Sequence, residues 1–176
     1  MNESRKYTII IVILTAAAIF TSFFLDIKIV MTLLFTILLL GSFLIKKEKV
    51  GGELIVAFLM ALALTSYYEY IYTTLNPLIG KINMFPLIAW TFGLVILREV
   101  YEKVKWEHKL LKISFLYVSL LFVIEYIGFY LLNIRLSGSY PSLLNMGIIH
   151  APIGMKAFYL LAGPVYLLIT DYLKVE

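Results

Sequence analysis

The stretch LLKISFLYVSLLFVIEYIGFYLLN, residues 110–133, decides the class of fold to which this chain belongs. Apart from Lys112 near its start and Glu125 near its end, the stretch carries no charged side chain. An α-helix needs about 20 apolar residues to cross the hydrocarbon core of a bilayer, and this stretch is long enough. The sequence therefore predicts a membrane-spanning helix here.

The rest of the chain repeats this pattern. Of its 176 residues, 62% are hydrophobic and only 15% are charged, which is unlike an average soluble domain. Polar breaks divide the apolar sequence into six segments of spanning length, at residues 7–25, 29–45, 53–73, 84–103, 110–133 and 156–173. We therefore expect an all-α, polytopic membrane helix bundle with about six transmembrane helices, forming a single domain over residues 1–176.

The basic residues predict how this bundle is oriented, because Lys and Arg are retained on the cytoplasmic side. With the N-terminus inside, 11 of the 15 Lys and Arg residues fall on the cytoplasmic side of the six predicted spans. We therefore expect both termini to be cytoplasmic in a multi-pass protein of the cell membrane. This topology accounts for the excess of basic over acidic residues, 15 against 11, and no basic stripe indicates binding to nucleic acid.

The residue inventory argues against several kinds of site. The chain has no cysteine, which excludes thiolate catalysis, thiolate metal sites and disulfides. Its two histidines, His108 and His150, fall on opposite sides of the predicted bundle, and no HExxH motif is present. We expect neither a metal site nor a cofactor.

Two carboxylates stand inside apolar runs, and each begins the triplet Glu-Tyr-Ile. They are Glu69 and Glu125. A carboxylate in hydrocarbon costs several kcal/mol, about 2.5–3.5 for Asp by insertion measurements, so each is a candidate functional residue. At a rise of about 1.5 Å per residue from the polar ends of their helices, both are predicted to lie at similar depth in the outer half of the membrane. The alternative is that each carboxyl only stabilises the bundle by hydrogen bonding across it.

The surroundings of the two carboxylates predict different roles. Helical spacing places a polar stripe beside Glu69, consisting of Thr65, Ser66, Tyr72 and Thr73. The equivalent positions around Glu125 are apolar or glycine. We therefore expect Glu125 to act as an acid and the more solvated Glu69 as a base, a combination that suits protonation of an olefin or an isomerisation.

Other candidate site residues gather at the predicted outer end. His150, in the long loop after the fifth span, is a proton shuttle, a metal ligand together with the carboxylates, or an ordinary interfacial residue, and we expect the last of these. Arg135 and Lys156 bracket that loop and either meet an anionic head group or diphosphate, or lie at the interface as helix-end cations commonly do. An apolar ligand cavity and an aromatic belt would use the same rings, among them Tyr70, Tyr72, Trp90 and Tyr126.

Two stretches resemble each other within the chain, and one resembles a known family. EYIYTTL (69–75) and EYIGFYL (125–131) align at Glu, Tyr, Ile and Leu, which indicates either an internal two-helix repeat or chance similarity. The stretch YEYIYTTLNPLIGKINMFPLIAW (68–90) resembles the integral-membrane carotenoid-biosynthesis enzymes of the lycopene cyclase and carotenoid hydratase type. This resemblance implies acid/base chemistry on a hydrophobic, isoprenoid-like lipid, with Glu69 and Glu125 against an isoprenoid double bond.

Two other functions stay open. Six helices in so short a chain, with the small residues Ala16, Ala17 and Ala18, resemble the substrate-binding membrane subunits of vitamin uptake systems, which implies a small-solute transporter. The third candidate is a structural accessory subunit whose Glu residues pair with a helix of another protein. The expected partners are thus membrane lipids and a hydrophobic small molecule, with a second copy of the chain or a partner membrane subunit, and whether the chain is an enzyme is open.

Overall fold

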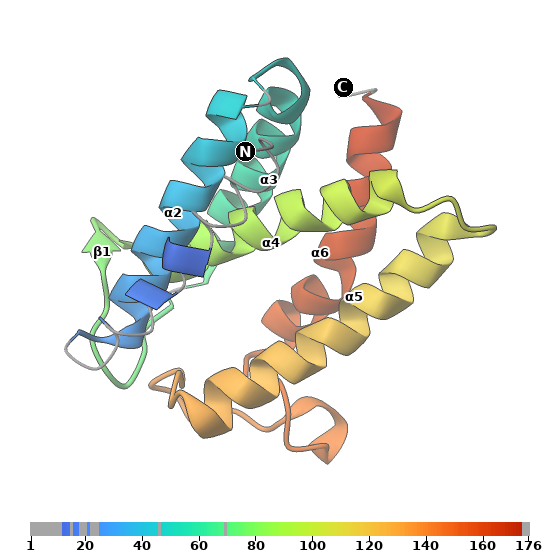
Figure 1. The fold of residues 1–176 in the computed structure, drawn as a ribbon. Helices are drawn as coiled ribbons and strands as arrows, with labels where there is room; N and C mark the ends of the chain where they lie inside the picture. The colour runs from blue at the N-terminus through green and yellow to red at the C-terminus, as the bar shows by residue number, and fades with distance from the viewer. Residues whose placement is uncertain are drawn as a thin grey trace.

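The fold is a bundle of helices with a short β-hairpin at one end, as a computed structural model describes it (Figure 1). The structure describes residues 12–14, 16–17, 21, 25–45, 47–68 and 70–173. Most of the predicted first span, and Glu69, lie outside these residues. The elements are α2 (Ile27–Ile45), α3 (Lys47–Tyr67), β1 (Leu78–Ile79), β2 (Ile82–Asn83), α4 (Met84–Lys103), α5 (Lys109–Tyr126) with a π turn (Ile127–Leu131), a 3-10 turn (Leu143–Asn145) and α6 (Ile153–Tyr172).

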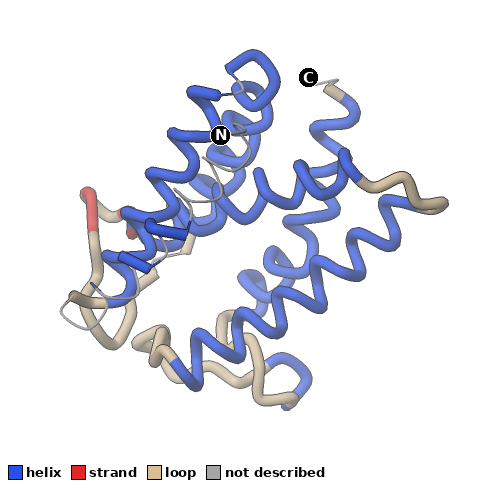
Figure 2. Tube along the Cα trace, viewed as in Figure 1, coloured by secondary structure: helices blue, strands red, loops and turns tan. Residues whose placement is uncertain are grey.

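Helices dominate the described chain, as Figure 2 shows. Four of the described helices are long and apolar enough to cross a membrane, at Ile27–Leu44, Met84–Lys103, Lys109–Leu131 and Ile153–Tyr172. The apolar part of α3, Gly51–Tyr67, is shorter. The prediction of a helical membrane protein is confirmed to this extent.

Helix α3 ends at Tyr67, six residues before the predicted end of the third span. Tyr72 and Thr73 therefore do not continue the polar stripe of Thr65 and Ser66, and that prediction is wrong. The reason lies in two asparagine side chains that take over the backbone groups of the segment. Their bonds are Tyr72 N to Asn76 Oδ1 at 2.7 Å, Asn76 Nδ2 to Tyr72 O at 3.1 Å and Asn83 Nδ2 to Tyr70 O at 2.8 Å.

The segments that follow the two Glu-Tyr-Ile triplets pair with each other. The Thr73 N–H donates to the Arg135 carbonyl at 2.9 Å, and the Ser137 N–H donates to the Ile71 carbonyl at 2.7 Å. These bonds flank an antiparallel bridge between Tyr72 and Leu136. Residues 70–71 of the first triplet lead to this bridge as a loop. Residues 125–127 of the second triplet belong to the end of α5 and the start of the π turn, so these parts of the two triplets differ in backbone structure.

Helix α3 packs against α4 and α6, α2 packs against α3 and α4, and α5 packs mainly against α6. Ala57 and Ala61 on α3 are fully buried. Small residues of this kind let helices approach closely, which matters in a bilayer because association there depends on packing rather than on the hydrophobic effect. The two ends of the bundle are called here the hairpin end (Asp26, residues 70–85 and 125–159) and the Arg98 end (the start of α3 and the ends of α4 and α6).

Candidate functional site

A cluster of aromatic side chains fills the interior near the hairpin end. The hydroxyls of Tyr70 and Tyr159 lie 3.3 Å apart and are hydrogen-bonded, although the two residues are only 2% and 7% exposed. The Trp90 ring lies 4.8 Å from the Tyr159 ring, and the Tyr72 ring lies 6.3 Å from the Tyr70 ring. Segments 70–72, α4 and α6 thus each contribute rings to one cluster.

Tyr117 joins this cluster from α5. Its hydroxyl donates to the Tyr159 carbonyl at 2.5 Å. Its ring lies against Gly163, where an added Cβ would come within 2.7 Å of the ring atoms. Glycine at this position of α6 therefore allows the close approach that brings Tyr117 and Tyr159 together.

Glu125 faces the same cluster. It is half-buried, and its charge acts on the hydroxyls of Tyr70, Tyr72, Tyr117 and Tyr159. Among the described residues it has no hydrogen-bond or ion-pair partner. An acid with no partner beside several hydroxyls can exchange a proton with a molecule that enters the cluster.

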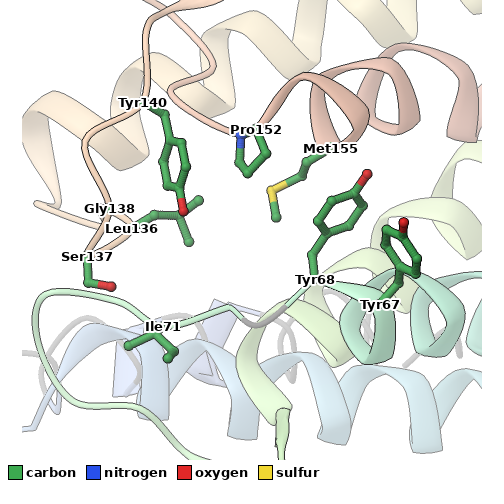
Figure 3. Close-up of a pocket in the computed structure, with 9 residues that line it drawn as sticks. All are labelled: Tyr67, Tyr68, Ile71, Leu136, Ser137, Gly138, Tyr140, Pro152 and Met155. Carbon is green, nitrogen blue, oxygen red and sulfur yellow. The ribbon is translucent and has the colours of Figure 1, made fainter.

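A cavity of about 270 Å³ opens beside this cluster (Figure 3). Tyr68 and Met155 face it from one side and Tyr140 from the other. The lining mixes apolar surface with hydroxyls and comes from the end of α3, the loop after α5 and the start of α6: Tyr67, Tyr68, Ile71, Leu136, Ser137, Gly138, Tyr140, Pro152 and Met155. A cavity of this kind suits an amphipathic rather than a fully polar ligand.

His150 and Arg135 lie together on another ring, that of Phe129. The imidazole stacks on Phe129 with the ring centroids 3.9 Å apart, and the guanidinium carbon lies 4.6 Å from the Phe129 centroid. Arg135 Nε also donates to the Phe129 carbonyl at 3.1 Å. Burial lowers the pKa of His150 below its usual value of 6.5, and the positive charges of Lys156 and Arg135 lower it further.

The structure groups some of the predicted site residues and separates others. Tyr70, Tyr72, Trp90 and Glu125 meet in the aromatic cluster, while His150 and Arg135 form the separate group on Phe129. Tyr126 is 52% exposed, and its ring lies against that of Tyr130, with the centroids 4.9 Å apart and the planes tilted by 40°.

Sequence reasoning missed Tyr117, Tyr159 and Asn83 as parts of this site. Tyr117 and Tyr159 are tyrosines within apolar helices, where a hydroxyl needs a partner, and that need was the available signal. Asn83 is fully buried. Its side-chain oxygen caps α4 by accepting from the Phe85 N–H, and its side-chain amide donates to the Tyr70 carbonyl. Its position just before the apolar run of α4 was the signal of a helix cap.

An ionic cluster at the Arg98 end was also missed. Arg98 Nε lies 3.3 Å from a carboxylate oxygen of Glu53 and 3.3 Å from one of Glu102, and Nη1 bonds to Asp171. The Tyr101 hydroxyl donates to the other Asp171 oxygen at 2.9 Å. This cluster joins α3, α4 and α6, and a single arginine inside an apolar span was its signal in the sequence.

We searched the described residues for a metal site and compared the chain with known proteins. In the described part of the chain no three His, Cys, Asp or Glu residues come close enough together to hold a metal ion. No family model, no curated protein and no solved structure matches the chain.

Proposed function

We propose that this chain is a multi-pass protein of the cell membrane that binds an isoprenoid-like lipid at the hairpin end and exchanges a proton with it through Glu125. The observation that carries the proposal is Glu125, a half-buried acid without a partner among the described residues, whose charge acts on the hydroxyls of Tyr70, Tyr117 and Tyr159. The cavity beside these rings supports it by offering an amphipathic lining.

The proposed topology has six spans with both termini in the cytoplasm. The Arg98 end then faces the cytoplasm and the hairpin end faces outward. Support comes from the four long apolar helices and from the many basic residues near the Arg98 end, since Lys and Arg favour the cytoplasmic side.

In the proposed reaction Glu125 donates its proton to one carbon of a carbon–carbon double bond. The other carbon becomes a cation, which the faces of neighbouring rings such as Tyr70 and Trp90 stabilise. Loss of a proton from an adjacent carbon back to the Glu125 carboxylate gives an isomer of the starting lipid, so atoms and charge balance and the acid is regenerated. Exclusion of water by the buried rings keeps the cation from being captured.

The test follows deuterium from solvent into a lipid. Wild-type protein and Glu125→Gln are incubated with farnesol in deuterated buffer, and farnesol is recovered for mass spectrometry. We expect wild type to add deuterium to farnesol and Glu125→Gln to add none, while Glu107→Gln, at an exposed loop residue near the Arg98 end, behaves as wild type. Equal incorporation by wild type and Glu125→Gln would contradict the role of Glu125.

Native mass spectrometry of the same samples separates binding from chemistry. Retention of farnesol without deuterium exchange would reduce the proposal to a lipid-binding protein. The absence of any retained lipid from folded wild type would favour an accessory membrane subunit instead, and retention of a polar solute would favour a transporter.

A further inference from the structure

Three basic side chains gather beside the cavity at the hairpin end: Arg135, His150 and Lys156. His150 and Arg135 both lie against the Phe129 ring, Lys156 bonds to the loop between them at residues 141–142, and the charges of Lys156 and Arg135 both act on the His150 ring. None of them forms an ion pair with a carboxylate among the described residues. Lys28, at the same end, differs because its Nζ lies 2.9 Å from Asp26 Oδ1. The group therefore carries positive charge that the described part of the protein does not neutralise.

Lys156 is the clearest case, because it is only 7% exposed. Its ammonium donates to the Pro141 carbonyl at 2.6 Å and to the Ser142 carbonyl at 3.3 Å. These carbonyls are neutral and satisfy its hydrogen bonds without cancelling its charge. A buried ammonium without a counterion is costly, and an anion bound beside it would remove that cost.

His150 offers a second polar atom at the same place. Its Nδ1 is buried and has no hydrogen-bond partner among the described residues. The ring is held by its stack on Phe129 and by a backbone fixed just before it, where the buried Ile149 adopts a φ of 51°. A β-branched residue rarely adopts this conformation, so the surrounding loop must impose it.

The three basic residues are next to the cavity in the chain. Arg135 precedes the lining residues 136–138, and Lys156 follows the lining residue Met155. His150 comes two residues before Pro152, which also lines the cavity. The basic group and the cavity are therefore built from the same two segments of the chain, residues 135–142 and 150–156.

We infer that Arg135, His150 and Lys156 bind a phosphate group, and that this group is the head of the lipid whose tail enters the cavity. The substrate class is then a polyprenyl phosphate rather than a hydrocarbon. Arginine suits a phosphate because its planar fork can donate two parallel hydrogen bonds, and lysine adds a compact charge. The inference rests on the proposed function for the tail and adds the head group independently.

The test compares three probes on the full chain in phosphatidylcholine nanodiscs: farnesyl phosphate, farnesol and inorganic phosphate. We expect wild type to bind farnesyl phosphate about tenfold or more tightly than farnesol, as the loss of a charge-assisted hydrogen bond implies. Arg135→Gln and Lys156→Gln should each remove most of this difference. Lys81→Gln, an exposed lysine in the hairpin at the same end, should leave it unchanged.

The two variants, Arg135→Gln and Lys156→Gln, differ in their expected effect on folding. Lys156 is buried and its replacement can weaken folding, but Arg135 is exposed, so Arg135→Gln reports on the head group in a folded protein. Equal binding of farnesol and farnesyl phosphate by wild type, or an unchanged difference in Arg135→Gln, would overturn the head-group inference while lipid binding stands.

The remaining outcomes separate the sources of phosphate. Weak or absent competition by inorganic phosphate supports a lipid head group, because affinity then needs the tail. Competition at the affinity of farnesyl phosphate would overturn the lipid assignment in favour of free phosphate. Failure of wild type to bind either farnesyl probe would overturn this inference together with the proposed function.

Discussion

Buried charged side chains have different partners at the two ends of the bundle. At the Arg98 end one guanidinium is surrounded by three carboxylates, from Glu53, Glu102 and Asp171. At the hairpin end Lys156 is equally buried but meets only carbonyl oxygens, and Glu125 has no described partner. Charges that satisfy each other hold helices together, whereas charges left unsatisfied inside a membrane protein point to a ligand.

The ionic cluster at the Arg98 end should be the more sensitive to mutation. We expect Arg98→Met to lower the free energy of unfolding by about 3–5 kcal/mol, because it leaves the buried Glu53 carboxylate without its partner. Thermal unfolding in mild detergent measures the effect. Lys103→Met, which removes a cation that is 75% exposed and pairs with Glu99, should cost at most about 0.5 kcal/mol. Similar losses in the two variants would mean that the Arg98 cluster adds no special stability.

The aromatic cluster near the hairpin end should depend on close packing between α5 and α6 instead. Gly163→Ala should lower the free energy of unfolding by about 1–3 kcal/mol, because the new methyl group overlaps the Tyr117 ring. Gly93→Ala on α4 is the matched control, since nothing lies within 4 Å of its Cβ position, and it should gain about 0.5–1 kcal/mol. Unfolding curves of the two alanine variants decide this, and a neutral Gly163→Ala would contradict the tight Tyr117 contact.

The stability of the protein should respond differently to replacement of Glu53 and of Glu125 by glutamine. Glu53→Gln weakens a charge-assisted hydrogen bond to Arg98 and should cost about 1–2 kcal/mol. Glu125→Gln breaks no described bond and should change the free energy of unfolding by less than about 0.5 kcal/mol. Thermal unfolding of both variants at one pH measures the contrast, and a larger loss in Glu125→Gln would assign Glu125 a structural role.

Acidification should have the smallest effect, and it should act at the hairpin end. The pKa of His150 in the folded protein is lower than 6.5, its usual value, so the unfolded chain binds more protons as the pH falls through 6.5. Stability should therefore decrease from pH 7.5 to pH 5.5, and less so in His150→Gln. His108→Gln, at an exposed loop residue, should follow wild type. An identical pH response in all three proteins would argue against a half-buried, neutral His150.

Local patterns in the sequence predicted the helices but not their endings or their long-range partners. The run of α5 was recognisable because it is long and apolar enough to cross a membrane. The end of α3 at Tyr67 was not, since it depends on Asn76 and Asn83, whose side chains bind the backbone of residues 70–72. Apolar content alone does not reveal such competition for backbone groups.

The candidate site was predicted in part for the same reason. Glu125 and Tyr70 were recognisable as polar groups in apolar surroundings. The partner of Tyr70 on α6 was not, because the contact between Tyr70 and Tyr159 joins residues 89 positions apart in the chain. Arg98 and Asp171 are likewise 73 positions apart, and no local pattern links them.

Helix α6 completes both ends of the bundle, and this has a consequence for biosynthesis. It supplies Tyr159 and Lys156 at one end, and Tyr166 and Asp171 at the other, where the Tyr166 hydroxyl donates to the Glu53 carbonyl at 3.2 Å. Until a ribosome has added α6, the helices before it can enter the membrane but neither end can close. Closure of both ends therefore waits for the translation of α6.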